Sequence, residues 1–301
     1  MAKGNARDIK RRIKSVTNTK KITRALQTVS AVKMRKAQTR TIATRPFAEE
    51  SLTLLRRLSG VTISKHPLLK KKSTGKQLVI LISPDKGLTG GLFSNLTRKV
   101  SDLVAKQQRE KNRETDFITI GSQAEKFVRA AGFNLVRAQK NGIVDVQLAR
   151  RMRDEIVTHY IKGPYDKIIV AYTQFVSTLR QKPFIRGILP ITLEKIVDVE
   201  ELPQELLTKP VAFDSAAYEL EPSPTLVVDK LIPDLVSMLL YHALLEAEAS
   251  EHSARMIAMK NAHDNASELI GDLTQTFNRL RQESITAALA EISAGVAALE
   301  K

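Results

Sequence analysis

The residues best suited to chemistry form a glycine-rich turn, Asp85-Lys86-Gly87-Leu88-Thr89-Gly90-Gly91, between a predicted strand and a predicted helix. The amino end of a helix binds phosphate because its free backbone N–H groups point at the anion. The turn matches neither G-x-G-x-x-G nor G-x-x-x-x-G-K-[ST], the two patterns with a known phosphate geometry. Such glycines more often serve tight backbone geometry. A nucleotide-dependent α/β enzyme therefore stays an alternative hypothesis that the motif does not establish.

No catalytic constellation is predicted from the other reactive side chains. The five histidines are scattered, and His252 and His263 fall on an apolar helical stripe, where packing or hydrogen bonding is their usual role. His263 and Asp264 are adjacent, so they do not face each other on a helix. The 301 residues include no cysteine, which excludes disulfides, thiol catalysis and cysteine-ligated metals. We predict no catalytic residue, no metal site and no cofactor.

The carboxyl-terminal part of the chain predicts one very long helix. No proline occurs from Asp234 to Lys301, and at 1.5 Å per residue this length corresponds to roughly 100 Å, more than the width of a compact domain. Apolar positions step by four and three, the 3.5 spacing of a coiled-coil seam: His252, Met256, Met259, His263, Ala266, Ile270, Leu273, Phe277 and Leu280. The stripe then shifts and resumes at Ile285, Leu289, Ile292, Val296 and Leu299, which predicts a local change of winding. We expect the helix to begin after Pro224 and Pro233.

A second long helix is predicted at the amino end. Between Ala6 and Ser59 there is no glycine and one proline, Pro46, where we expect a bend. Its apolar stripes comprise Ile9, Ile13 and Val16, then Ile22, Leu26, Val29 and Val32, and beyond the proline Leu52, Leu55 and Leu58. Because the two long helices lie at opposite ends of one chain and are joined by a globular insert, we predict that they pair as an antiparallel intramolecular coiled coil. Two ordinary bundle helices remain the alternative.

The middle of the chain has the pattern of a doubly wound, Rossmann-like α/β domain. Short buried strands are predicted at 77–83, 116–120 and 167–172. One helix is predicted from the glycine-rich turn to about residue 111, and two more at 123–131 and 147–161. Alternating strands and helices indicate a mostly parallel sheet covered on both faces. Segments 175–179 and 184–189 predict an added hairpin, and 202–224 an exit linker. The predicted domains are 1–60, 75–222 and 223–301.

The net charge of +16 is concentrated in the first helix, where residues 1–40 hold 13 Lys or Arg and the single acid Asp8. Nucleic acid, anionic lipid and an acidic protein surface could each attract such a helix. These residues include no aromatic side chain, which single-stranded nucleic acid would use for stacking, and the cations lie on several faces. We therefore expect an acidic protein partner, with a nucleic-acid-binding coiled coil or a merely solvated face as alternatives.

Membrane insertion and export are not expected. No run of apolar residues approaches the length of a membrane-spanning helix, and the amino terminus lacks the apolar core of a signal peptide. We expect a protein that faces the cytosol.

Seven motifs in order match one family. They are Asp8-Ile9-Lys10-Arg11-Arg12-Ile13, Lys21-Ile22-Thr23-Arg24-Ala25-Leu26, Lys33-Met34-Arg35-Lys36, Asp85-Lys86-Gly87-Leu88, Ala254-Arg255-Met256, Asp264-Asn265-Ala266 and Arg281-Gln282-Glu283-Ser284-Ile285-Thr286. The chain resembles the gamma subunit of F-type ATP synthases over essentially its whole length. The resemblance implies a central rotor shaft without an active site or cofactor, which couples proton flow through the membrane c-ring to ATP synthesis and hydrolysis in the alpha and beta subunits. It also implies contact with the epsilon subunit, no nucleic acid, no direct membrane insertion, and a place on the cytoplasmic face of a bacterial plasma membrane.

The resemblance also assigns residues. Lys20, Lys21, Arg24 and Leu26 match the segment that meets the acidic lever loop of the beta subunits; Arg281, Gln282 and Thr286 match a beta-loop contact near the bearing. The bearing tip comprises Leu289, Ile292, Val296 and Leu299, and the coiled-coil seam comprises Met256, Met259, Ile270, Leu273, Phe277 and Leu280. Two departures are Thr89, where many relatives have cysteine, and Leu26, where many have methionine.

Overall fold

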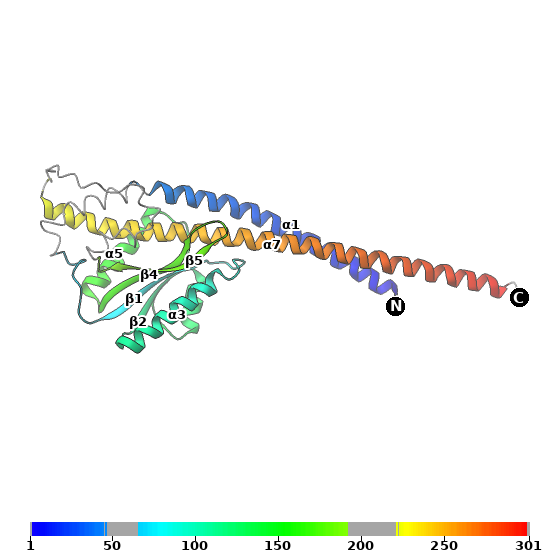
Figure 1. Cartoon of the computed structure of the whole chain (residues 1–301), viewed down its shortest axis with the longest axis horizontal. Coiled ribbons are helices and arrows are strands. Elements are labelled where there is room, and N and C mark those ends of the chain that lie inside the picture. Colours follow the sequence, from blue (N-terminus) through cyan, green and yellow to red (C-terminus); the bar gives the residue numbers. More distant parts are fainter. Residues whose placement is uncertain (1, 45, 47–65, 192–220, 222, 300–301) are drawn as a thin grey trace. The chain divides into compact units, whose positions relative to one another are not determined.

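The computed structural model describes residues 2–44, 46, 66–191, 221 and 223–299 of the chain. The chain forms two compact units. The two-helix unit comprises Met1–Ala31 and Arg255–Lys301, and the α/β unit comprises Val32–Ala254. Helices α1 (Ala2–Ala43) and α7 (Pro224–Leu299) each contribute residues to both units (Figure 1). The three predicted domain boundaries stay a prediction.

The α/β unit is built on a five-stranded sheet with the order β3-β2-β1-β4-β5. Its strands are β1 (Lys76–Ile82), β2 (Thr115–Ile120), β3 (Asn134–Gln139), β4 (Tyr165–Phe175) and β5 (Gln181–Leu189). The first four pair in parallel, and β5 pairs antiparallel to β4. All but the first residue of β1 are buried, as expected of a parallel strand covered on both faces.

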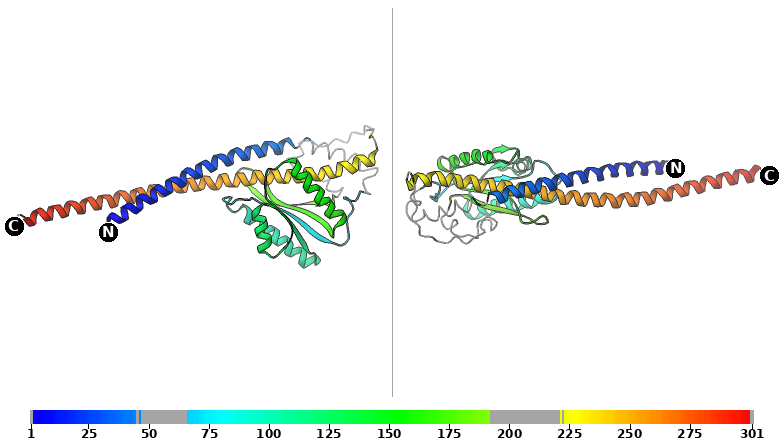
Figure 2. Two further views of the ribbon diagram at one scale, coloured as in Figure 1. Left: turned by 180° about the vertical axis from the view of Figure 1, so that it is seen from behind. Right: turned by 90° about the horizontal axis from the view of Figure 1, so that it is seen from above.

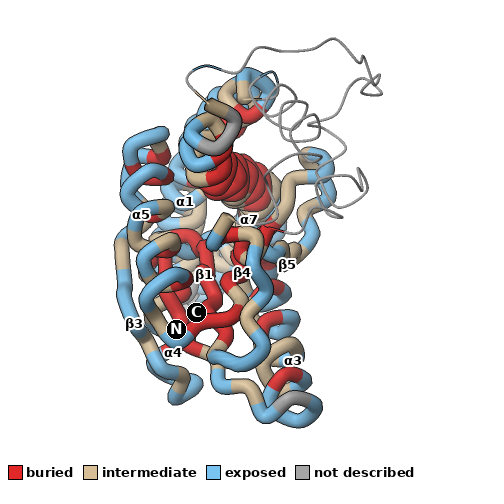
Figure 3. Tube along the Cα trace, turned by 90° about the vertical axis from the view of Figure 1, so that its left-hand side faces the viewer, coloured by how far each residue is buried: buried red, intermediate tan, exposed pale blue. Residues whose placement is uncertain are grey.

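Helices cover both faces of this sheet and create two cores. Helices α3 (Leu92–Lys111) and α4 (Ser122–Ala130) pack over a core that includes Val79, Leu81 and Phe117. Helix α5 (Val146–Lys162) and the first part of α7 contribute to the opposite core, with Leu78 and Ile80 from the sheet. Figure 3 shows this stretch of α7 as a run of buried backbone. The predicted doubly wound fold is confirmed.

Helix α7 begins earlier than predicted. It starts at Pro224 and includes Pro233, although proline lacks the N–H for a helical hydrogen bond and usually costs a helix about 3 kcal/mol. The side chains around Pro233 are well packed: Ile232 is fully buried and Leu235 is 2% exposed. Apolar burial on several sides thus stabilises a helical turn that the proline alone would disfavour.

The strands of the structure differ from the predicted ones in two places. Strand β3 was not predicted, because its six residues are mostly exposed and form no apolar run. The predicted hairpin of 175–179 with 184–189 is wrong in its first strand, because residues 176–180 form a turn. The second strand is confirmed as part of β5, which begins at Gln181, includes Pro183 and pairs with β4. Proline is tolerated there because β5 is an edge strand. The predicted continuation through 52–58 and the exit linker lie outside the described residues, apart from positions 221, 223 and 224.

In the two-helix unit, α1 and α7 run antiparallel, as predicted (Figure 2). Buried or half-buried side chains step by four and three along α1: Ile9, Ile13, Val16, Lys20, Thr23, Gln27 and Ser30. The corresponding positions of α7 are Met256, Met259, His263, Ala266, Ile270, Leu273, Phe277 and Leu280. Both series have the 3.5 spacing of a coiled-coil seam.

The second apolar stripe predicted on α1 is wrong. Ile22, Val29 and Val32 are 60%, 52% and 63% exposed, whereas Leu26 is half-buried. Continuing the 3.5 spacing from Val16 leads to Lys20 and then to positions with small or polar side chains. The two stripes lie on different sides of α1, and only one side can face α7. Since the side that begins with Ile9 packs against α7, Ile22, Val29 and Val32 stay exposed to solvent.

Candidate subunit-contact surfaces

A polar contact lies within the seam of the two-helix unit. His263 Nδ1 is 3.2 Å from the carbonyl oxygen of Lys20, and the hydroxyl of Thr23 donates to the same oxygen over 2.9 Å. A carbonyl only accepts, so His263 donates from Nδ1. Thr23 is 7% exposed, so this network is part of the packed seam. A polar pair within an apolar seam specifies how two helices align.

This contact also fixes where α1 ends against α7. Because the helices are antiparallel, moving from Lys20 back to Ala2 on α1 corresponds to moving from His263 to about Arg281 on α7. Beyond that point Ile285, Leu289 and Ile292 are 52%, 60% and 64% exposed. Figure 1 shows α7 continuing past the amino terminus within this unit. The predicted shift of the apolar stripe thus coincides with the end of the partner helix.

The basic residues assigned to a lever contact differ in exposure. Lys21 and Arg24 are exposed, while Lys20 and Leu26 are half-buried. The guanidinium of Arg24 donates to the Gln27 side chain over 3.1 Å, which leaves its charge unneutralised. Lys21 has no acidic partner among the described residues of the unit. This part of α1 therefore presents positive charge to the surroundings.

The residues assigned to the bearing region lie at the other end of α7. Arg281, Gln282 and Thr286 are exposed, as are Leu289 and Ile292. Val296 and Leu299 belong to the same helix. A surface that alternates polar and apolar side chains on a helix without a partner suits contact with another protein chain. The assigned contact roles stay predictions.

The glycine-rich turn of the α/β unit is held by its own carboxylate. Asp85 Oδ1 accepts hydrogen bonds from the N–H and hydroxyl of Ser122, at 2.8 and 3.0 Å, and from the N–H of Asn141, at 3.2 Å. Ser83 Oγ accepts from the N–H of Ala124 over 2.8 Å. The amino end of α4, the helix after β2, is thus occupied by the chain itself. The helix that the turn opens is α3, whose N-cap residue Gly91 makes no side-chain cap hydrogen bond.

Glycine is required where this turn meets α4. Gly121 has φ of 102°, and a Cβ atom there would lie 2.1 Å from the Ser83 carbonyl oxygen. Leu88 and Gly90 in the turn also have positive φ, at 65° and 58°. Gly90 and Gly121 therefore serve backbone geometry, and these contacts give no support to the hypothesis of a nucleotide-dependent enzyme.

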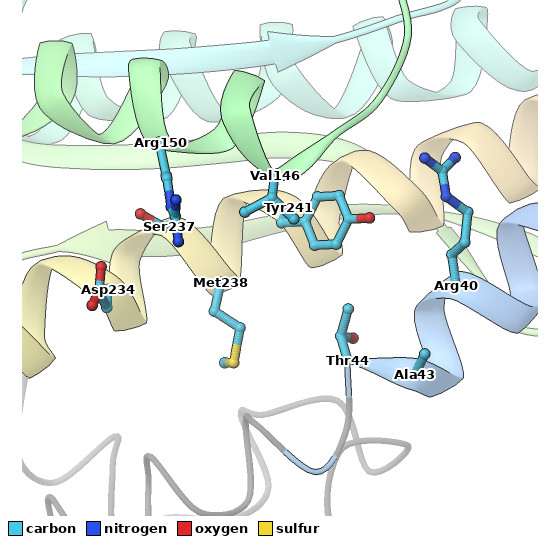
Figure 4. Close-up of a pocket in the computed structure, with 9 residues that line it drawn as sticks. All are labelled: Arg40, Ala43, Thr44, Val146, Arg150, Asp234, Ser237, Met238 and Tyr241. Atoms are coloured by element: carbon cyan, nitrogen blue, oxygen red, sulfur yellow. The ribbon is translucent and has the colours of Figure 1, made fainter.

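A pocket of about 460 Å³ opens between α1, α5 and α7 within the α/β unit (Figure 4). It is lined by Arg40, Ala43, Thr44, Val146, Arg150, Asp234, Ser237, Met238 and Tyr241. Arg40 is used structurally: it donates to the Val144 carbonyl over 2.6 Å and lies 3.5 Å from Glu248. Asp234 pairs with Arg153 at 2.8 Å. These charges hold helices together, and the lining contains no paired acid and base for catalysis.

Glu248 of α7 is a partly buried carboxyl group that lies close to basic residues of α1. Burial raises the pKa of Glu248, even though Arg40, Lys33 and Lys36 act in the opposite direction.

Among the described residues, no cluster of three or more His, Cys, Asp or Glu side chains could hold a metal ion. Within the same residues, no helix is long and apolar enough to cross a membrane.

The geometry defines a class of protein in which the two ends of the chain form an antiparallel coiled coil and the middle forms a doubly wound α/β domain. A family model described as ATP synthase matches residues 5–299. The ATP synthase gamma chain of Herpetosiphon aurantiacus is 40% identical, over 99% of both chains, and that of Dehalococcoides mccartyi is 39% identical, over 98% of this chain and 99% of the relative. The chain belongs to the ATP synthase gamma-chain family.

Solved structures support the same fold. A chain of the Euglena gracilis mitochondrial ATP synthase, in a complex of OSCP, F1 and c-ring, has a TM-score of 0.65 at 19% identity, with 98% of this chain and 95% of that chain covered. A chain of the Tetrahymena thermophila central stalk and c-ring has a TM-score of 0.58 at 22% identity, with coverage of 80% and 99%. At these identities the likeness concerns the fold.

Packing or hydrogen bonding was the role expected of His263 from the sequence, but the Lys20 carbonyl on the other helix was not identified as its partner. The position of His263 on the apolar stripe was the available signal, since a seam histidine needs a hydrogen-bond partner. The partner could not be predicted, because it is a backbone carbonyl, which has no sequence signature.

We predict that His263→Ala weakens the two-helix unit by about 1 kcal/mol, the typical net worth of one hydrogen bond. Amide hydrogen exchange of α1 around Thr23 should accelerate by roughly fivefold. The matched control is Asp264→Ala, which changes an exposed neighbour on the same helix. Equal exchange rates in the two variants would show that the His263–Lys20 contact does not stabilise the pair.

Proposed function

We propose that this chain is the central rotor shaft of an F-type ATP synthase. It couples proton flow through a membrane c-ring to ATP synthesis and hydrolysis in a head of alpha and beta subunits, and it is itself non-catalytic. The observation that supports this most is the antiparallel pairing of the two chain ends, with α7 extending beyond α1 at its carboxyl end. The membership of the gamma-chain family supports it independently.

The physical properties of the coiled coil suit transmission of torque. Helical hydrogen bonds run along the axis of each helix, so the backbone resists stretching. The seam and the His263 contact resist sliding of one helix past the other. The pair is asymmetric around its axis, because α1 is strongly basic whereas the segment of α7 beside it, 255–281, carries both acids and bases. Rotation of such a pair presents a different surface to each surrounding subunit in turn.

We propose three contact regions on this shaft. Lys21 and Arg24, aided by Lys20 and Leu26, meet an acidic lever loop of the beta subunits, and Arg281, Gln282 and Thr286 meet a second beta-subunit loop. The tip, with Leu289, Ile292, Val296 and Leu299, turns within an apolar sleeve. Exposed aliphatic side chains support a sleeve, since burying them removes apolar surface from water.

The proposed partners are the alpha, beta and epsilon subunits and the c-ring, with no nucleic acid, no cofactor and no direct membrane insertion. The names of the similar structures, which mention F1, a c-ring and a central stalk, support such an assembly. We place the chain on the cytoplasmic face of a bacterial plasma membrane, where a peripheral subunit would contact the ring. A nucleic-acid-binding coiled coil receives no support from the relatives.

Lys21→Glu combined with Arg24→Glu tests whether these cations meet an acidic loop. Opposing an acidic loop with acidic side chains should lower ATP-driven proton pumping by about tenfold, because like charges at a contact cost several kcal/mol. Pumping is measured with a pH-sensitive dye in inverted membrane vesicles. Lys10→Glu with Lys14→Glu, exposed positions on the same helix, is the charge-matched control. Equal pumping by both double variants would refute a position-specific lever contact.

The tip is tested by removing residues 287–301. Since full burial of one Leu or Ile side chain is worth about 1.5–3 kcal/mol, loss of the sleeve contact should reduce pumping at least about fivefold, while assembly of the complex partly survives. Assembly is followed by native gel, and pumping by the same dye. Undiminished pumping by the shortened chain would count against a bearing role for the tip.

A further inference from the structure

The turn between β4 and β5 presents an exposed leucine on a well-formed scaffold. The N–H groups of Val176 and Ser177 both donate to the Arg180 carbonyl, over 3.2 and 2.9 Å, and the N–H of Arg180 donates back to the Ser177 carbonyl over 3.1 Å. Leu179 is 84% exposed and Val176 is 43% exposed. The backbone of this turn is thus closed by hydrogen bonds while its largest apolar side chain points to solvent.

A second set of hydrogen bonds ties this turn to α7 within the α/β unit. Ser253, which is fully buried, donates to the Thr178 carbonyl over 2.7 Å. The side-chain amide of Gln181 donates to Ser253 Oγ over 3.3 Å and to the Thr178 carbonyl over 2.9 Å. Because the turn is held in place before any partner arrives, binding through Leu179 would cost little ordering of the backbone.

The surroundings of Leu179 are positively charged. From Phe175 to Leu189 the chain contains Arg180, Lys182 and Arg186 and no acidic residue. Arg180 and Lys182 are exposed, and neither forms an ion pair among the described residues. Lys99 of α3 donates to the Pro183 carbonyl over 3.0 Å and adds a further cation beside β5. The hairpin surface, defined here as Val176, Leu179, Arg180 and Lys182, therefore combines an apolar tip with a cationic rim.

We propose that the hairpin surface docks an acidic segment of a partner protein, with Leu179 entering an apolar hollow and carboxylates facing Arg180 and Lys182. Charge complementarity of this kind sets orientation and encounter rate. A protein fits better than a lipid surface, because membrane binding uses a wide apolar face and this surface has two apolar side chains. The proposal rests on the proposed function only in requiring a complex with other subunits. The residues of the hairpin surface differ from those of the contact regions proposed on α1 and α7.

The first test uses cross-linking from Leu179→Cys, labelled with a benzophenone maleimide before assembly. The chain contains no cysteine, so the label is unique within it. The labelled chain is assembled with alpha, beta and epsilon subunits and bound to inverted membrane vesicles that contain the c-ring. The vesicles are illuminated, and the cross-linked peptide is identified by mass spectrometry. Ile143→Cys, at a position that is also 84% exposed, is the matched control.

The account expects a cross-link from position 179 to a peptide with at least two Asp or Glu residues beside the attachment point. A complex that assembles and pumps protons but gives no cross-link, or a cross-link to lipid or to a peptide without acids, overturns the hairpin proposal alone. Failure of the unlabelled chain to join the complex would instead overturn the proposed function.

The second test reverses the rim charge with Arg180→Glu and Lys182→Glu in the labelled background. We expect the cross-link yield to fall about tenfold, as for like charges brought together at an interface. Arg109→Glu with Lys140→Glu changes the same charge at exposed positions elsewhere on the α/β unit and should leave the yield unchanged. Equal yields from the two double variants would show that an acidic partner does not meet this rim.

Discussion

The structure of the two-helix unit depends on the pairing of the two chain ends along one continuous seam. The seam follows one unbroken 3.5-residue spacing, which includes Ile9, Ile13 and Val16 on α1 and Ile270, Leu273 and Phe277 on α7. The same spacing places Lys20, Thr23 and Ser30 in the seam and leaves Ile22 and Val29 exposed to solvent. The bond from the His263 N–H to the backbone carbonyl of Lys20 specifies how the two helices align along this seam.

Within the α/β unit, α7 serves as a core element. Residues 235–240 are all buried, which is the pattern of a helix surrounded by protein. The helix also makes polar contacts inside this core: the Tyr172 hydroxyl donates to Glu246 over 2.6 Å, with both side chains at or below 1% exposure. Ser253 adds the connection to the β4–β5 turn. The same continuous helix therefore belongs to the packed interior of one unit and to the coiled coil of the other.

Much of this arrangement could be predicted from the sequence, because long-range periodicity and buried strand runs are strong signals. The α7 seam from Met256 to Leu280 has the predicted 3.5 spacing, and β1 is the predicted buried run. The helix start at Pro224 was missed because tertiary burial around Pro233 offsets an unfavourable local propensity. Strand β3 was missed because an exposed edge strand has little apolar patterning.

The candidate contact surfaces were less predictable. Sequence patterns could place Lys21 and Arg24 on a basic helix but could not show that Lys20 lies half inside the seam. The exposure of Leu289 and Ile292 follows from the end of α1, which depends on the alignment of two helices distant in sequence. Likewise, the fixed turn that presents Leu179 depends on Ser253, more than seventy residues further along the chain.

The central claim is that this chain turns inside a stationary head. Its lack of cysteine allows one probe to be attached, through Arg109→Cys, to an exposed side chain of the α/β unit. With the alpha and beta subunits immobilised on a surface, the orientation of that probe is followed by single-molecule microscopy after ATP is added. The account predicts continuous rotation in one direction while ATP is hydrolysed. A probe that keeps a fixed orientation during sustained hydrolysis would contradict it.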